Sequence, residues 1–262
     1  MQVYRGLPIL TNQPERPTRL VAIREPTEEM SVAEFATLAQ AAIDELVAAH
    51  GTAVVAGGTG LYLRAALADL GIPPRAAAAA RARWQELVDE DPGAAHARLA
   101  RIDPAAAAVV HPNDTRRLVR ALELAEVGAS LVPEVDRLWG SEWRRPTLVF
   151  GLEVKARELE RRIRSRTAAM LERGAAAEAR AALERPLSRT AEKALGLREL
   201  AELPEDEALE RVVLRTRRYA AYQRKWMRRI PGVVAVDATG SVGDAVEAIL
   251  ATVRPEGTGA PV

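Results

Sequence analysis

The feature that most constrains the fold is an apolar run that passes directly into a glycine turn and then into a helical pattern. Thr52–Ala56 reads Thr-Ala-Val-Val-Ala, Gly57–Gly60 reads Gly-Gly-Thr-Gly, and apolar residues at helical spacing continue to Leu70. Another helical pattern, over 31–50, precedes the run. Helix, strand, turn and helix in this order predict an α/β protein with a parallel sheet, in which ligands bind at the carboxyl ends of the strands.

The glycine turn allows two interpretations. Gly57 and Gly58, followed by Thr59, could present backbone N–H groups and a hydroxyl to a phosphate at the N-terminus of the next helix. A tight strand-to-helix turn also needs glycine for its geometry alone. The sequence contains no Gly-x-x-x-x-Gly-Lys-Ser/Thr motif, so the turn is not a phosphate loop of that type.

Further apolar runs predict the other strands of the sheet. They are Leu20–Ile23, Thr147–Val154 and Val233–Asp237. Residues 155–185 and 189–230 carry long charged helical patterns. Short apolar strands that alternate with such helices are typical of the α/β class.

The region between the second and third predicted strands has a different character. It is rich in alanine and arginine at helical spacing and contains no candidate strand. We therefore expect a discontinuous α/β core formed by residues 1–72 and 146–252, with 73–145 as an all-helical insertion. The tail, 253–262, is rich in proline and glycine and is expected to be frayed.

Composition excludes several kinds of site. The chain has no cysteine, which excludes disulfides, thiolate metal sites and a cysteine nucleophile. The histidines lack metal-ligand spacing and are His50, His96 and His111. The sequence has neither an apolar run long enough to span a membrane nor a signal peptide, so we expect a cytoplasmic protein with no membrane segment.

Positive charge is concentrated in one segment, although the chain as a whole is nearly neutral, with 37 basic and 36 acidic residues. Residues 211–229 carry eight arginines and lysines and no acid. Helical spacing places most of them on one face with a tyrosine: Arg211, Arg215, Arg218, Tyr222, Lys225 and Arg229. An unpaired cationic face favours a polyanion such as a nucleic acid, and a solvated helix face is the alternative.

Short motifs follow one another along the chain from residue 1 to about 237. They are Met1–Gly6, Gly57–Arg64, His111–Asp114, Arg116–Glu123, Arg162–Gly174, Ala194–Gly196 and Thr216–Trp226. Each motif is modest alone, whereas the ordered set is specific. In order and spacing the set resembles the tRNA dimethylallyltransferase family, also called the IPP transferase family.

The resemblance implies a P-loop-NTPase-like α/β fold with a helical insertion that binds tRNA. It also implies transfer of a dimethylallyl group from dimethylallyl diphosphate to N6 of adenine 37 in tRNA, with Mg²⁺ assisting the diphosphate. The adenine is expected to be flipped into a channel through the core. tRNA and dimethylallyl diphosphate are thus the expected partners, and nothing in the sequence suggests more than a monomer.

The resemblance also assigns residues to roles. Thr59 corresponds to the threonine at the channel and is the expected catalytic residue within these 262 residues, and Gln2 lies beside the flipped adenine. The other residues expected to contact tRNA are Arg81, Arg116, Arg117, Leu118, Val119, Arg120, Lys193, Arg198, Tyr222, Gln223, Arg224, Lys225, Trp226 and Arg228. Those expected to hold the diphosphate are Gly57, Gly58, Arg166 and Arg217. A leaving group that departs as an anion needs positive charge nearby.

In one respect the sequence departs from the family's pattern. Family members carry a strand, a phosphate loop and a second strand ending in Asp-Ser before the segment that matches Met1, and this aspartate is the expected general base. These roughly 35–40 residues are absent from the sequence. We therefore expect the active form to begin upstream of Met1 and the 262-residue chain alone to be inactive, with a non-catalytic tRNA-binding protein as the alternative.

Overall fold

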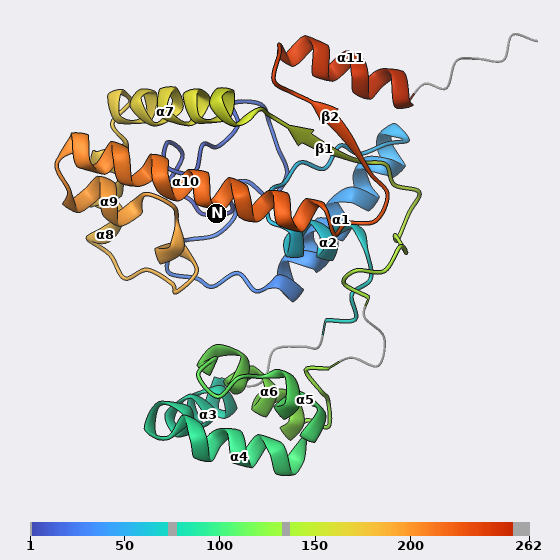
Figure 1. Cartoon of the computed structure of the whole chain (residues 1–262), viewed down its shortest axis with the longest axis vertical. Coiled ribbons are helices and arrows are strands. Elements are labelled where there is room, and N and C mark those ends of the chain that lie inside the picture. Colours follow the sequence, from blue (N-terminus) through green and yellow to red (C-terminus); the bar gives the residue numbers. More distant parts are fainter. Residues whose placement is uncertain (1, 73–77, 133–136, 254–262) are drawn as a thin grey trace, which may run out of the picture. The chain divides into compact units, whose positions relative to one another are not determined.

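The computed structural model describes residues 2–72, 78–132 and 137–253 and divides into two compact units. We call Met1–Ala68 together with Ser141–Val262 the core unit, and Asp69–Gly140 the helical unit (Figure 1). The predicted bounds of the insertion, 73 and 145, lie four and five residues beyond the observed ones. The predicted frayed tail falls outside the described residues, apart from its first residue, which ends a helix.

A pair of parallel strands lies in the core unit. β1 (Val149–Glu153) pairs with β2 (Val233–Asp237) in register, so that Val149 lies opposite Val233 and Glu153 opposite Asp237. Both strands fall where the sequence predicts them. Parallel strands need a crossover connection, and the helices between residues 156 and 227 supply it. The predicted α/β class with a parallel sheet is confirmed.

Two predicted strands are not formed. Leu20 and Ala22 adopt positive φ angles of 65° and 52°, so the first run is a turn, and only an isolated bridge joins Tyr4 to Arg24 beside it. Thr52–Ala56 is extended but pairs with no strand among the described residues, and Val54 is 92% exposed. The first run bonds the N-terminal segment only through isolated contacts, such as the Ala22 N–H to the Gln2 carbonyl and the Ile23 N–H to the Val3 carbonyl, and the second run has no strand partner among the described residues.

The helices of the core unit follow the predicted pattern. They are α1 (Val32–His50), α2 (Gly60–Leu67), α7 (Ala156–Glu172), α8 (Ala175–Leu183), the 3₁₀ helix η1 (Ala191–Lys193), α9 (Leu197–Glu202), α10 (Glu205–Met227) and α11 (Val242–Val253). Ser31 caps α1 by accepting a hydrogen bond from the Glu34 N–H, and Gly51 ends it with a φ of 75°. A serine N-cap and a glycine in the left-handed region are common start and stop signals of a helix.

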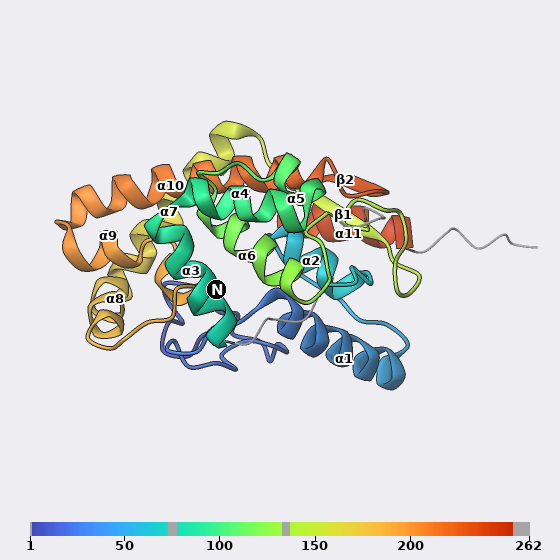
Figure 2. The ribbon, with the colours of Figure 1, turned by 90° about the horizontal axis from the view of Figure 1, so that it is seen from below.

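The long helix α10 organises the core unit. It extends from α9 at one end to β2 at the other, in Figure 1 and in the turned view of Figure 2. Its buried residues Val212, Val213 and Thr216 face the neighbouring helices, among them α7. No helix within the described parts of the chain is both long and apolar enough to cross a membrane.

The N-terminal segment is held in place by the helices that follow α7. Tyr4, Leu7 and Leu10 are buried in one hydrophobic cluster with residues of α8, α9 and α10. The carboxylate of Glu178 on α8 accepts hydrogen bonds from the Ile9 N–H at 3.0 Å and the Leu10 N–H at 2.7 Å. The segment that carries Gln2 is therefore fixed to α8 although it contains no regular secondary structure.

The helical unit packs around its own small core. It consists of α3 (Ala78–Glu90), α4 (Pro92–Ile102), α5 (Pro104–Val109) and α6 (Thr115–Glu126). Its buried residues are Val88, Ala95, Leu99, Ala106, Val110, Leu118, Val119, Ala121 and Leu122. Asp91, Asp103 and Asp114 cap α4, α5 and α6 through their side chains, which fixes the turns between the helices.

A charged residue lies inside this core. Glu123 on α6 is only 1% exposed, and its two carboxylate oxygens each accept an ion-paired hydrogen bond at 3.2 Å, one from Arg81 on α3 and one from Arg120. A buried carboxylate is tolerated only when such partners satisfy it. The three residues therefore join α3 to α6.

We predict that Glu123→Ala strongly destabilises the helical unit. The substitution leaves two half-buried guanidinium groups without their carboxylate, and we expect a loss of about 3 kcal/mol, measured by urea unfolding followed by circular dichroism. The matched control is Glu126→Ala, which removes a more exposed carboxylate three residues along the same helix and should cost less. Equal losses in the two variants would contradict the structural role of Glu123.

Candidate functional site

The glycine turn packs against one face of α10. The Thr59 hydroxyl and the Tyr219 hydroxyl are 2.9 Å apart and share a hydrogen bond. Gln223 and Trp226 follow Tyr219 at intervals of four and three, so the three side chains lie on the same face of the helix. This face meets the turn where α2 begins.

Two glycines of the turn lie where side chains of α10 approach the backbone closely. A Cβ atom added at Gly60 would lie 2.2 Å from the indole Cε3 of Trp226, and one at Gly58 would lie 1.9 Å from Nε2 of Gln223. Neither glycine has a positive φ. The sequence offers phosphate binding and turn geometry as reasons for glycine here. The structure adds a third, which is contact with a helix more than 160 residues away in sequence.

The N-terminus of α2 opens onto this contact. Thr59 is the N-cap of α2, but its side chain makes no capping hydrogen bond, because the hydroxyl is engaged by Tyr219. A helix N-terminus without a side-chain cap favours an anion through its N–H groups and its dipole. The turn and the start of α2 therefore have the electrostatic character that the phosphate interpretation requires.

A buried cation lies under the same helix. Arg64 on α2 is fully buried, and its guanidinium carbon lies 4.4 Å from the ring centroid of Trp143. Desolvation lowers the pKa of Arg64, yet arginine remains charged at neutral pH. In the sequence, Arg64 stands out only as the last residue of the Gly57–Arg64 motif. The spacing of apolar residues does not predict that its side chain is buried.

The C-terminal half of α10 carries the charge that is open to solvent. Arg218, Lys225 and Arg228 are exposed and Arg224 is half-buried, and among the described residues none of the four has an ion-pair partner. Tyr222 is 51% exposed and lies edge-on to Trp226, with 6.3 Å between the ring centroids. An exposed aromatic ring among arginines and a lysine is a surface that suits a nucleic acid.

The N-terminal half of the same helix does not carry an unpaired cationic face, which corrects the sequence prediction. Arg211 pairs with Glu207 at 3.4 Å, Arg215 pairs with Glu199, and Arg217 pairs with Glu160. Glu199 lies on α9 and Glu160 lies on α7, so a count of charges within 211–229 does not include them. The available charge is therefore limited to the end of α10 near the glycine turn.

The residues predicted to hold the diphosphate are not gathered at one point. Gly57 and Gly58 form the turn, whereas Arg217 bonds Glu160 on α7 at 3.1 Å. Arg166 lies on α7, is exposed, and makes no ion pair within the described chain, and desolvation by surrounding atoms lowers its pKa. No hydrogen bond in the described parts joins either arginine to the turn.

The other predicted contacts of the core unit lie on separate surfaces. The Gln2 side chain donates to the Asn12 carbonyl at 2.6 Å and is exposed. Lys193 and Arg198 are exposed on η1 and α9, and Arg198 pairs with Glu192 and Glu202. These residues border the cluster that anchors the N-terminal segment, but no polar contact within the described residues joins them to Thr59.

The predicted contacts of the helical unit divide into two groups. Leu118 and Val119 are fully buried in its core, so their side chains do not reach a ligand, contrary to what the motif implied. Arg81 and Arg120 are engaged by Glu123. The exposed members of the predicted set are Arg116 and Arg117 at the start of α6.

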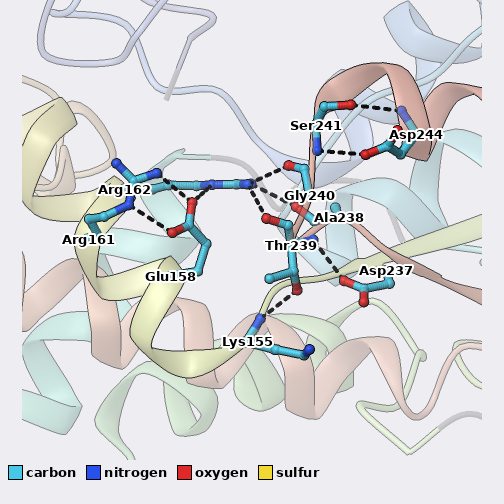
Figure 3. Close-up of polar contacts among 10 residues, drawn as sticks. All are labelled: Lys155, Glu158, Arg161, Arg162, Asp237, Ala238, Thr239, Gly240, Ser241 and Asp244. Atoms are coloured by element: carbon cyan, nitrogen blue, oxygen red, sulfur yellow. Dashed lines mark hydrogen bonds and ion pairs between the residues drawn. The ribbon is translucent and has the colours of Figure 1, made fainter.

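At the carboxyl ends of β1 and β2, Arg162 binds the loop that follows β2, and we call this arrangement the arginine clamp (Figure 3). Arg162 on α7 donates to the carbonyls of Ala238 at 2.8 Å, Thr239 at 2.8 Å and Gly240 at 2.9 Å. Its Nε donates to Glu158 at 2.6 Å. One guanidinium thus fixes the loop after β2 to the first turns of α7, so the groups at this edge serve the fold.

Glu158 orients this clamp and is strongly acidic. Hydrogen bonds from Arg161 and Arg162 lower its pKa from the ordinary 4.5 to about 2. On the other side of the loop, hydrogen bonds from the Thr239 side chain and from the Thr239 N–H, the latter at 2.8 Å, lower the pKa of Asp237. The carboxylate of Glu158 is therefore ionised over the whole physiological range and is a weak base near neutral pH.

The described residues offer no cluster of three or more histidine, aspartate or glutamate side chains that could hold a metal ion. His96 instead lies with Nε2 at 3.0–3.1 Å from the carbonyls of Val110 and Ala107, inside the helical unit. His111 accepts a hydrogen bond from the Asn113 N–H. The Mg²⁺ that the resemblance implies therefore has no all-protein site in the described parts of the chain.

Fold and site together define an α/β protein in which a glycine turn packs against a basic helix and a separate helical unit is inserted between α2 and β1. The family model described as IPP transferase matches residues 2–230, which covers most of the chain and both units. The chain belongs to the IPP transferase family.

Two relatives named tRNA dimethylallyltransferase support this assignment. The chain is 42% identical to a tRNA dimethylallyltransferase of Thermobifida fusca over 251 residues, which cover 89% of this chain and 76% of that protein. It is 40% identical to a tRNA dimethylallyltransferase of Kineococcus radiotolerans over 247 residues, which cover 89% of this chain and 77% of the relative.

Solved structures show the same fold. The full-length tRNA isopentenylpyrophosphate transferase of Bacillus halodurans matches with a TM-score of 0.65 and 29% identity, over 96% of this chain and 84% of that one. A eukaryotic dimethylallyltransferase, whose structures are described as snapshots of the enzyme acting on tRNA, matches with a TM-score of 0.75 and 26% identity, over 96% of this chain and 69% of that one. The fold class predicted from the sequence is confirmed.

We predict that Gly60→Ala disturbs the contact between the turn and α10. The added methyl group cannot occupy its place without moving the Trp226 ring, and overpacking of this kind costs about 1–3 kcal/mol. Thermal unfolding and tryptophan fluorescence measure the change. Gly57→Ala is the matched control, because its Cβ would meet only Leu63 Cδ1, at 3.8 Å. If both variants unfold like the wild type, the close packing is not as described.

The clamp predicts a specific dependence on pH. The folded pKa of Glu158 is about 2 and its ordinary value is 4.5, so ionised Glu158 stabilises the fold fully above about pH 4.5, and this stabilisation is lost as pH falls toward 2. Glu158→Gln should therefore melt below the wild type at pH 7, and the difference should vanish by about pH 2.

Glu184→Gln is the control for this experiment, because Glu184 is exposed and makes no ion pair within the described residues. It should match the wild type at every pH. A Glu158→Gln melting temperature equal to that of the wild type at pH 7 would show that the clamp contributes nothing to stability.

Proposed function

We propose that the chain transfers a dimethylallyl group from dimethylallyl diphosphate to N6 of adenine 37 in tRNA. Membership of the IPP transferase family and relatives named tRNA dimethylallyltransferase support this reaction. The structural observation that carries it is the contact between Thr59 and Tyr219, which places the glycine turn beside the open basic end of α10. A turn suited to an anion and a surface suited to RNA thus adjoin one another.

The reaction requires that the leaving diphosphate is stabilised and that the adenine is oriented, and we assign both tasks to residues of the turn. The N6 nitrogen attacks the allylic carbon, the bond from that carbon to the diphosphate oxygen breaks, and N6 releases one proton to water. The leaving diphosphate accumulates negative charge, which the N–H groups at Gly57, Gly58 and the start of α2 stabilise, with Arg166 and Arg217 as further cations. Thr59, held by Tyr219, orients the reacting adenine at the turn.

Recognition of tRNA is assigned to the exposed charges of both units. On α10, Arg224, Lys225 and Arg228 meet backbone phosphates, and Tyr222 offers its ring to a base. Gln223 and Trp226 act through the turn that they contact. The remaining proposed contacts are Gln2, Lys193, Arg198, Arg116 and Arg117, with Arg81 and Arg120 acting by supporting α6.

Mg²⁺ commonly binds through substrate phosphates and only one or two carboxylates. Since the described residues contain no cluster that would hold it, we assign no step of the reaction to the ion. We further propose that the protein works as a monomer in the cytoplasm. Nothing in the sequence suggests more than a monomer, and the cytoplasm is where tRNA is available.

Disruption of the gene in its own organism tests the proposed reaction. We expect N6-dimethylallyladenosine to disappear from total tRNA, as measured by nucleoside mass spectrometry, and to return when the intact gene is restored. If the modified nucleoside persists at its normal level in the disrupted strain, the proposed function is wrong.

The same strain tests the role of Thr59. Restoring the gene with Thr59→Val removes the hydroxyl that bonds Tyr219 and should slow modification about tenfold, which corresponds to one hydrogen bond of about 1.4 kcal/mol. The matched control is Thr37→Val on α1, whose hydroxyl bonds only the Ala33 carbonyl of the same helix. Equal rates for both variants would remove Thr59 from the site.

A further inference from the structure

The helical unit carries a groove that none of the assigned residues lines. Its volume is about 410 Å³, and it is lined by Arg83, Trp84, Leu87, Ala94, Arg98 and Arg101. The lining comes from α3 and α4, whereas the predicted RNA contacts Arg116 and Arg117 lie at the start of α6. We propose that this groove binds backbone phosphates of the tRNA substrate, an inference that rests on the proposed function.

The cations of the groove are available to a ligand. Arg98 and Arg101 are exposed, project from one side of α4 three residues apart, and have no ion-pair partner in the described parts of the chain. Neither helix of the groove places an acid among the lining residues. Two unpaired guanidinium groups at this spacing are complementary to neighbouring phosphates of an RNA backbone.

The floor of the groove is held rigid and apolar. The Trp84 indole donates to Glu126 at 2.6 Å, and the Arg83 guanidinium, which pairs with Glu126, lies 5.3 Å from the indole centroid. Leu87 and Ala94 complete the apolar part. Such a floor accepts the ribose of a nucleotide while the two free arginines hold the phosphates on either side.

The arginines of the helical unit thus divide by role. Arg81 and Arg120 form ion pairs with buried Glu123, and Arg83 forms an ion pair with Glu126. Arg98 and Arg101 take part in no such pair among the described residues, and exposed arginines that stabilise nothing in the fold are the ones that a polyanion can recruit. This leaves α4 as a contact surface of its own.

Binding of tRNA at several salt concentrations tests the proposal. The full chain with Arg98→Ala and Arg101→Ala should bind tRNA at least about tenfold more weakly at low salt, and the slope of log affinity against log salt should decrease by about 1.4–1.8 for two lost phosphate contacts. The double variant should melt like the wild type, since both side chains are exposed.

The matched control removes the same charge elsewhere. Arg180→Ala with Arg185→Ala deletes two exposed arginines of the core unit that make no ion pair within the described residues. We expect this control to change affinity less than about twofold and to keep the wild-type salt slope. Binding of dimethylallyl diphosphate, which the groove does not contact, should be unchanged in both double variants.

The experiments distinguish failure of the groove proposal from failure of the proposed function. If the wild type binds tRNA but the Arg98/Arg101 variant behaves like the control, the groove is not an RNA contact, while the proposed reaction is unaffected. If the variant loses binding of inorganic phosphate but keeps tRNA affinity, the groove serves a free anion and the proposal is overturned. If gene disruption leaves adenine 37 modified, the proposed function fails independently of this result.

Discussion

The contact between the glycine turn and α10 is the interaction on which the rest of the site depends. Gly60 lets the backbone of the turn lie against the Trp226 ring, where a Cβ atom would be 2.2 Å from Cε3, and Gly58 lies beside the side-chain amide of Gln223. The Thr59–Tyr219 hydrogen bond then fixes the turn along the helix. Because α10 also packs on α7 and α9, while α2 packs on α1, the turn joins these two parts of the core unit.

Along α10, the charged residues that form ion pairs within the fold and those that face solvent lie in different halves of the helix. Its first turn is acidic, with Glu205, Asp206 and Glu207, and its last turn is basic, as the helix dipole favours. Arginines of the first half, such as Arg211 and Arg215, are used in ion pairs, whereas those near the glycine turn face solvent. Only the second half of the helix therefore presents positive charge to a ligand.

The sequence predicts best those features whose causes are local. Ser31 and Asp114 act as caps because the hydrogen bond spans only three residues. The Thr52–Ala56 strand was wrong because a strand needs a backbone partner, which composition cannot supply. Glu123 is 42 residues from Arg81, so its burial and pairing could not be inferred, and Arg81 was assigned to RNA instead. The hydrogen bond between Thr59 and Tyr219 joins residues 160 positions apart, so no local pattern predicts it.

Hydrogen–deuterium exchange of the chain with and without tRNA tests the central claim most directly. If the glycine turn and the end of α10 form one RNA-facing site, tRNA must slow backbone exchange in peptides that cover both 57–63 and 219–228. Peptides from the first half of α10, whose arginines are paired, should exchange at the same rate in both states. Protection of that first half, with no change at the turn, would contradict the account.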